Sequence, residues 1–185
     1  DIVITRIHEY FSNMSFSRTK EFYLALHKHL FGDIYPFAGE IRTINIEKQE
    51  RVLAWDSVKY VSYDKINDEL DATFEILSHT DFLSLDIEMQ KDFLTSLISD
   101  LWGIHAFREG NGITLRTYLE LVVDYISEMN NLNFELRYSL WDEEDRDNLI
   151  RASILLNSNE SNKGKVLLRN CFDKVLVEKK REKVR

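Results

Sequence analysis

The side chains best suited to chemistry lie in one short segment, HAFREGNGITLR at residues 105–116, between two helical patterns. Gly110, Asn111 and Gly112 predict a sharp turn that leaves backbone N–H groups unpaired at the start of the following helix. Those N–H groups and the helix dipole form an anion site that suits a phosphate group.

Other residues of this segment could act on a bound phosphate. His105 ends the preceding helix and could take a proton from an attacking hydroxyl. Glu109 could hold a magnesium ion, which prefers carboxylate and phosphate oxygens together. Arg116 lies near the first turn of the next helix, where a cation opposes the dipole, so an anion in front of it would explain its position. Phe107 is apolar and is expected to anchor the turn in the core.

Each of these residues also has a structural explanation when taken alone. A histidine at a helix end is often structural, glycine–asparagine–glycine is an ordinary turn, and Glu109 could simply be solvated. The combination H-x-F-x-E-G-N-G is much rarer, since average residue frequencies give a chance occurrence of about one in ten million. The pattern as a group therefore indicates a functional site.

Helical periodicity predicts the elements that position this turn, and only one proline and six glycines interrupt the chain. Apolar spacing predicts helices on both sides of the turn, the first beginning at Asp86 and the second continuing through Ile126. A loop with Gly32, Pro36 and Gly39 comes earlier in the chain. Further helices are predicted over residues 15–30, 62–78, 142–157 and 163–177. About six helices predict an all-α domain.

A small β-hairpin is the one expected departure from helix. Residues 42–46 alternate like a short strand, and residues 52–55 could form its return partner. The hairpin lies between the first two predicted helices of the chain.

The bulk composition predicts one soluble domain spanning residues 1–185. The formal net charge of -8 and a pI of about 5.2 argue against nucleic acid as a partner. No apolar run is long enough to span a bilayer, so no membrane segment is expected. The basic run at residues 179–185 is expected to be a solvated end.

The motif at residues 105–116 resembles the signature of the Fic family, HxFx(D/E)GNGRxxR. A second segment, LFGDIYPFAGEIR at residues 30–42, is similar to the family's upstream motif, which leads into a hairpin called the flap. The resemblance covers residues 15–129, with the helices expected over 142–178 less characteristic. It implies the Fic fold, a helical bundle with a β-hairpin flap.

The resemblance also implies an activity, protein adenylyltransfer. His105 would be the general base that activates a Ser, Thr or Tyr hydroxyl of a target protein, and this oxygen would attack the α-phosphorus of ATP. Glu109 would bind Mg²⁺, Gly110, Asn111 and Gly112 would hold phosphate oxygens, and Arg116 would meet the γ-phosphate. The flap that docks the target would comprise Ile44, Asn45, Ile46, Glu47, Lys48, Val52 and Leu53.

Three positions depart from the family pattern. Phe37 stands where tryptophan is common, and Ala106 replaces a common proline. Ile113 stands where the family has its first arginine, and isoleucine cannot neutralise a phosphate. The alternatives are therefore a catalytically impaired binding module, an enzyme that uses another donor, or a Doc-like enzyme that transfers a phosphoryl group.

The resemblance does not decide how the protein is inhibited or where it acts. The inhibitory pattern (S/T)xxxE(G/N) is matched only in part at residues 17–21, so a small antitoxin-like inhibitor is a possible partner. A bacterial cytoplasmic location is the default expectation, and a secreted effector would have the same features.

Overall fold

The computed structural model describes residues 2–13, 15–49, 57–130, 134–156 and 159–178. These residues form seven α-helices, four short strands in two sheets and three single 3₁₀ turns. The predicted all-α architecture with a small hairpin is confirmed. The helices are α1 (Ile2–Asn13), α2 (Lys20–Phe31), α3 (Ile66–His79), α4 (Ile87–Ile104), α5 (Asn111–Met129), α6 (Glu143–Leu156) and α7 (Ser161–Val175).

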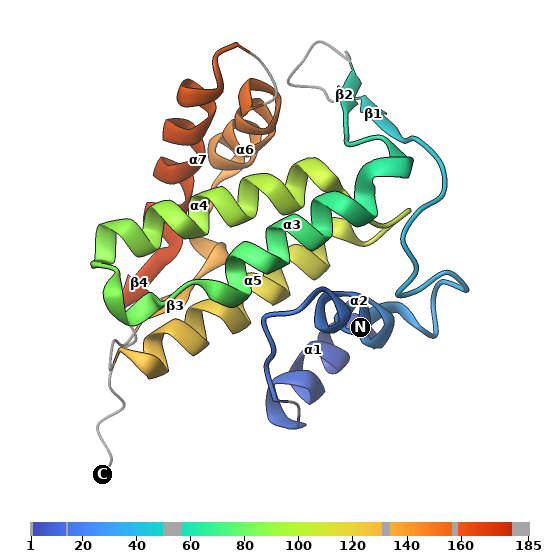
Figure 1. Cartoon of the computed structure of the whole chain (residues 1–185), viewed down its shortest axis with the longest axis horizontal. Helices are drawn as coiled ribbons and strands as arrows, with labels where there is room; N and C mark the ends of the chain where they lie inside the picture. Colours follow the sequence, from blue (N-terminus) through green and yellow to red (C-terminus); the bar gives the residue numbers. More distant parts are fainter. Residues whose placement is uncertain (1, 14, 50–56, 131–133, 157–158, 179–185) are drawn as a thin grey trace.

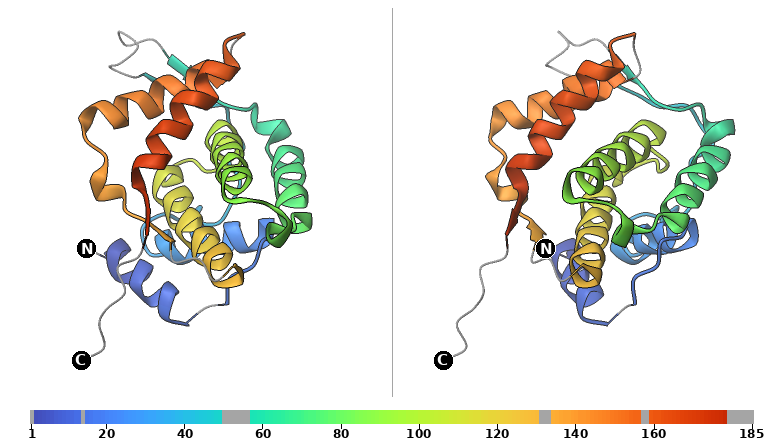
Figure 2. Two further views of the ribbon diagram at one scale, coloured as in Figure 1. Left: turned by 90° about the vertical axis from the view of Figure 1, so that its left-hand side faces the viewer. Right: turned by 60° about the vertical axis from the view of Figure 1, so that its left-hand side comes forward.

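Helix α4 runs through the centre of the bundle (Figure 1). It packs against α3 on one side and against α7 and α6 on the other, with α5 crossing beneath it (Figure 2). Asp86 begins α4 as predicted, because its carboxylate accepts the Met89 N–H at 2.8 Å as an N-cap. The turn that carries the motif joins α4 to α5, so the site lies between the two central helices.

An aromatic cluster fills the core between α2, α3 and α5. Tyr23, Phe107 and Tyr118 are each at most 2% exposed. The ring of Tyr23 lies 5.5 Å from that of Phe107 and 5.2 Å from that of Tyr118, in tilted and edge-on arrangements that aromatic pairs favour. The prediction that Phe107 anchors the turn in the core is confirmed.

The hairpin prediction was wrong about which residues form the strands. Strand β1 comprises Glu47–Gln49 and pairs antiparallel with β2, Ser57–Lys59. Residues 42–46 precede the strand, and Ile44 is 47% exposed rather than packed on a sheet face. The predicted return partner at residues 52–55 lies outside the described residues.

The helix boundaries also differ from the predicted ones. Helix α2 begins at Lys20 rather than at residue 15, because the Thr19 hydroxyl caps it by accepting the Phe22 N–H. Helix α7 ends at Val175, and the chain continues as β4 (Leu176–Glu178), which pairs with β3 (Phe134–Leu136). This second sheet and α1 were not predicted. The basic run at 179–185 lies outside the described residues.

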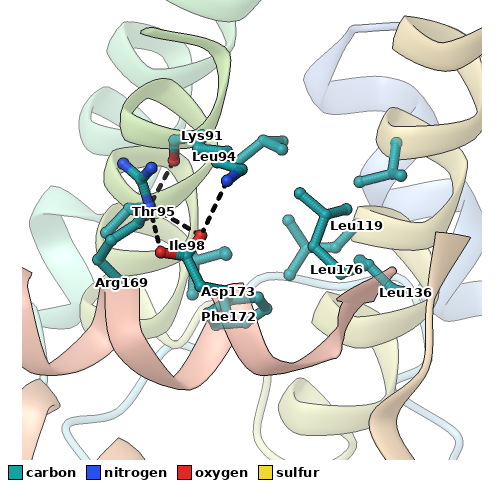
Figure 3. A pocket seen from close by; sticks show the side chains of 11 residues that line it. Lys91, Leu94, Thr95, Ile98, Leu119, Leu136, Arg169, Phe172, Asp173 and Leu176 are labelled. Atoms are coloured by element: carbon teal, nitrogen blue, oxygen red, sulfur yellow. Dashed lines mark hydrogen bonds and ion pairs between the residues drawn. The ribbon is translucent and has the colours of Figure 1, made fainter. Parts of the chain in front are cut away.

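An ion cluster joins α7 to α4 on the surface (Figure 3). Arg169 contacts Asp92 and Glu88 of α4 and Asp173 of its own helix, and Lys91 lies 3.5 Å from Asp173. The pocket beside the cluster has about 20 Å³ and a mostly apolar lining, room for about one water molecule. We therefore assign this region a role in helix packing. Within the described chain, no helix is both long and apolar enough to cross a bilayer.

Candidate active site

The reversal between α4 and α5 uses two left-handed residues. Gly110 has φ 79° and precedes α5, whose first residue is Asn111. His105 has φ 47° and ψ 60° and caps α4; it is the one non-glycine residue with positive φ in the described part of the chain. Such a conformation costs an L-residue about 1–2 kcal/mol. Strain of this kind concentrates at functional sites, which draws attention to His105.

The Asn111 side chain closes the turn. Its Oδ1 accepts the Phe107 N–H at 2.9 Å, and its Nδ2 donates to the Phe107 carbonyl at 2.7 Å. The amide is therefore committed to holding the turn, on both its donor and its acceptor side. What Asn111 can offer an anion in this arrangement is its backbone N–H at the start of α5.

A buried histidine on α2 supports the end of the turn. His27 is fully buried, and its ring stacks on Phe107 at 3.7 Å between centroids with 11° between planes. The Nδ1 atom accepts the Gly39 N–H at 2.8 Å, so Nε2 carries the proton and donates to the Glu109 carbonyl at 3.0 Å. Burial lowers the pKa of His27 below its ordinary value, which favours this neutral form. His27 therefore links α2, the loop at Gly39 and the turn between α4 and α5.

A buried arginine supports the beginning of the turn. Arg42 is only 2% exposed, and its backbone N–H donates to the Ala106 carbonyl at 2.9 Å. Desolvation lowers the pKa of the Arg42 guanidinium below its ordinary value. The guanidinium donates to four backbone carbonyls, those of His105 (2.8 Å), Ile44 (2.6 Å), Ile104 (3.3 Å) and Val61. Arg42 thus holds the end of α4 against the segments on either side of the hairpin.

The His105 imidazole lies against an aromatic ring from the segment after β2. Its centroid is 3.8 Å from that of Tyr60, with 17° between the planes. The pKa of His105 is lowered to about 4, mainly by burial; the nearby charges of Arg42 and Lys48 also lower it, and a hydrogen bond to the Trp102 backbone opposes them. The ring is therefore neutral at pH 7, the state in which it can accept a proton.

Replacing Tyr60 with alanine is expected to raise the pKa of His105 toward its ordinary value of about 6.5, because the ring then faces water. The change can be measured by NMR titration of the His105 ring protons. Tyr63 is an exposed tyrosine three residues further on, so Tyr63→Ala serves as the control. An unchanged His105 pKa in Tyr60→Ala would show that stacking does not exclude water from the ring.

A cavity of about 660 Å³ opens beside the turn, a volume typical of small-molecule sites. We call it the turn cavity. It brings together these residues that the sequence predicted: His105, Glu109, Gly110, Asn111, Gly112, Arg116 and Lys48. Four flap residues do not line it: Ile44, Asn45, Ile46 and Glu47. Val52 and Leu53 lie outside the described residues.

Other lining residues of the turn cavity were not identified from the sequence. Trp102 comes from α4, and Tyr138 and Trp141 come from the segment before α6. One face of α6 also lines the cavity, with lining residues three and four positions apart: Arg146, Leu149, Ile150 and Ser153. This helical spacing was visible in the sequence, but only the fold shows that the face turns toward the motif.

Arg116 and Ile113 contribute different kinds of surface to the cavity. Arg116 is exposed one turn after Gly112, and its carbonyl accepts the Tyr138 hydroxyl at 3.0 Å. Ile113 is half-buried, packs on the core and also lines the cavity, so it contributes apolar surface and no charge.

A magnesium site would depend on the nucleotide. Glu109 is exposed at the cavity wall, and nowhere in the described residues do three His, Cys, Asp or Glu side chains gather into a metal site. One carboxylate with substrate phosphates is a usual magnesium environment, so the residues present fit an ion that arrives with a nucleotide.

The two glycines of the turn are expected to respond differently to alanine. A Cβ at Gly110 would lie 2.6 Å from the buried Phe31 ring and would occupy a positive φ, whereas a Cβ at Gly112 meets nothing within 4 Å. Gly110→Ala is expected to lower the free energy of unfolding by about 2 kcal/mol. Gly112→Ala is expected to leave it unchanged or raise it by up to about 1 kcal/mol, because alanine favours helix. Urea denaturation measures both, and equal midpoints would contradict the assigned geometry.

The fold and the site together define a helical domain in which a glycine turn at a helix N-terminus and a neutral histidine share one cavity. The chain belongs to the Fic/DOC family, whose profile matches residues 17–123. It is 31% identical over 131 residues to the protein adenylyltransferase VbhT of Bartonella schoenbuchensis, covering 70% of this chain and 24% of VbhT. It is 33% identical over 106 residues to the probable protein adenylyltransferase y4lH of Sinorhizobium fredii, covering 56% of this chain and 51% of the relative.

Solved structures agree with the observed fold. The fold superposes with a TM-score of 0.70 on BepC, a VirB-translocated effector protein of Bartonella tribocorum with bound AMPPNP. The match covers 97% of this chain and 84% of BepC at 14% identity, so it establishes the fold alone. The chain spans about a quarter and about half the length of the two curated relatives.

Proposed function

We propose that this protein transfers AMP from ATP to a Ser, Thr or Tyr hydroxyl of a target protein. The observation that supports the proposal best is the position of His105, a neutral imidazole on the wall of the cavity that the glycine turn at the start of α5 also lines. A protein that only binds nucleotide has no need of a base beside an anion site. The names of VbhT and y4lH agree with the same chemistry.

In the proposed reaction, His105 accepts the proton of the target hydroxyl. The hydroxyl oxygen forms a bond to the α-phosphorus of ATP, the bond from this phosphorus to the α–β bridging oxygen breaks, and pyrophosphate leaves with that electron pair. The products are the AMP-modified side chain and pyrophosphate, and His105 then returns its proton to solvent.

The turn stabilises the charge that this step moves onto the phosphate oxygens. Backbone N–H groups at residues 110–112 begin α5 and point along a helix dipole that favours anions. Arg116 binds the terminal phosphates in this proposal. Preorganised donors of this kind are a large source of rate enhancement, because they need no reorganisation during the reaction.

Glu109 is the residue that would hold Mg²⁺ on the nucleotide. The ion would supply positive charge at the phosphates, and its carboxylate ligand lies at the cavity wall. His27 fixes this position, because it binds the Glu109 carbonyl.

The hairpin is the proposed docking site for the target segment. In the described chain its sheet has two strands, and all three β1 residues are exposed. An added extended segment would pair with a strand edge through backbone hydrogen bonds. Ile44, Asn45 and Ile46 are also exposed or half-buried beside β1. A target bound in this way is recognised more by its backbone than by its side chains.

The test uses the purified protein with Mg²⁺, a lysate containing target proteins, and ATP labelled at either the α- or the γ-phosphate. Label transferred only from the α-position, and absent with His105→Ala, is the expected result. Label only from the γ-position would indicate phosphoryl transfer instead.

A third outcome would indicate that Ile113, in place of arginine, has changed the donor or ended catalysis. No label from either position, with folded protein that still binds ATP, would contradict AMP transfer and favour a binding module. Repeating the assay with α-labelled UTP, GTP and CTP would then reveal a different donor. We further propose a cytosolic site of action, in the bacterium or in a host cell, with a small antitoxin-like protein as a possible inhibitor.

A further inference from the structure

The absence of an arginine at position 113 raises the question of which cation replaces it. The side chain there is Ile113, which lines the turn cavity but packs on the core. A nucleoside triphosphate carries three to four negative charges, and a cavity that binds it needs more than one cation or metal charge near the tail. The described cavity wall has four cationic side chains: Lys48, Arg108, Arg116 and Arg146.

Two of these cations, Lys48 and Arg108, lie near aromatic or imidazole rings. Lys48 belongs to the hairpin and is close enough to His105 to lower the pKa of that ring. The Arg108 guanidinium lies over the Phe37 ring, 5.5 Å from its centroid. Arg116 and Arg146 remain as cations on the walls formed by α5 and α6.

Arg146 lies on the face of α6 that turns toward the cavity. This face continues through Leu149, Ile150 and Ser153, at positions three, four and seven residues further along the helix. The guanidinium of Arg146 makes no hydrogen bond or ion pair within the described residues. Both arginines are exposed, but Arg151, five residues on, donates to the Asn148 side chain at 2.9 Å.

Two of the acidic residues near Arg146 in sequence, Asp142 and Asp145, are paired with a cation of another helix. Lys174 of α7 donates to the carboxylates of both Asp142 and Asp145. Arg146 also lies within the first four residues of α6, where the helix dipole disfavours a cation. An anion in the turn cavity would offset that cost, as it would for Arg116.

We propose that Arg146 is the second cation for the terminal phosphates of the nucleotide, in place of an arginine at position 113. Arg116 from α5 and Arg146 from α6 would then bind the phosphate tail from two different helices that line the turn cavity. The proposal rests on the proposed nucleotide-dependent function and identifies a binding residue contributed by a different helix from the motif.

The experiment measures binding of Mg–ATP, AMP and inorganic tripolyphosphate by calorimetry to the wild type and to Arg146→Gln. Arg146→Gln is expected to weaken ATP and tripolyphosphate about tenfold and AMP less than twofold. The matched control on the same helix, Arg151→Gln, is expected to bind all three like the wild type. Adding Ile113→Arg to Arg146→Gln is expected to restore most of the lost affinity, because it returns a cation to the same phosphates.

Each contrary result has a separate meaning. Equal weakening of AMP and ATP would place Arg146 at the nucleoside, and unchanged tripolyphosphate binding would remove it from the phosphate site. Either result overturns the proposal while leaving AMP transfer intact. A wild type that binds tripolyphosphate through Arg146 but transfers no label from α-labelled ATP would instead overturn the proposed function alone. A wild type that binds neither ATP nor tripolyphosphate would overturn both.

Discussion

Replacing His105 with alanine is expected to reduce AMP transfer by about a hundredfold to ten-thousandfold, the usual contribution of a general base. ATP binding is expected to remain, because the backbone of residues 110–112 and Arg116 are unchanged. Measurement of kcat and KM separates the two effects: kcat should fall while KM for ATP changes little. His79→Ala is the matched control, since His79 is an exposed histidine at the end of α3.

The same variant is expected to alter stability at acid pH. The folded-state pKa of His105 is about 4, below the unfolded value of about 6.5, so the folded state binds fewer protons in this interval. Wild-type stability is therefore unaffected by this group above pH 6.5 and falls as the pH decreases toward 4, by about 1.4 kcal/mol per pH unit. His105→Ala removes that contribution, so urea denaturation of the variant should show a shallower decline between pH 6.5 and 4. Identical declines would mean that His105 protonates freely in the folded state.

Replacing Arg42 with methionine is expected to lower the free energy of unfolding by about 3 kcal/mol. The guanidinium is buried, and its removal leaves four backbone carbonyls without their donor, each costing about 1–3 kcal/mol before water enters. Lysine is not expected to substitute, because one ammonium group cannot reach all four carbonyls with its three donors. Urea denaturation measures the loss, with the exposed Arg151→Met as the control.

Arg42→Met is also expected to reduce transfer at temperatures where the variant is still folded. Arg42 binds the His105 carbonyl, so its loss releases the backbone that holds the base in its left-handed conformation. A fall in kcat with unchanged ATP affinity would fit this positioning role. A variant with wild-type stability and wild-type kcat would show that the four hydrogen bonds are not needed.

The sequence was sufficient to predict the turn, because its chemistry is local. Glycines at 110 and 112 predict a tight turn with unpaired backbone N–H groups wherever a helix follows. Asp86 and Phe107 were likewise predictable, one as an N-cap and the other as an apolar residue in a polar segment.

The position of the hairpin strands in the sequence was not predictable, because contacts of side chains outside the strands determine it. Arg42 is committed to the turn at 104–106, and the Asn45 side chain accepts the Tyr63 N–H at 2.9 Å. Both contacts draw residues 42–46 away from the ladder that their alternating pattern suggested. The contacts join positions at least eighteen residues apart, and no local pattern contains them.

The cavity wall from α6 was missed for a related reason. The spacing of Arg146, Leu149 and Ile150 shows that one face of the helix differs from the others, but not what lies in front of it. The packing of α6 and α7 against α4 decides this, through side chains distant in sequence.

The turn between α4 and α5 is held at both of its ends by residues from earlier in the chain. This limits how short a fragment of the protein can be and still hold the turn in place. Arg42 holds residues 104–106 and His27 holds residue 109, so both supports come from a stretch more than sixty residues earlier in the chain. A fragment that begins after residue 42 would contain every residue of the motif yet neither of these supports. In this protein the motif is therefore not a transferable module, and grafting residues 105–116 onto another pair of helices would carry over the chemistry without the geometry.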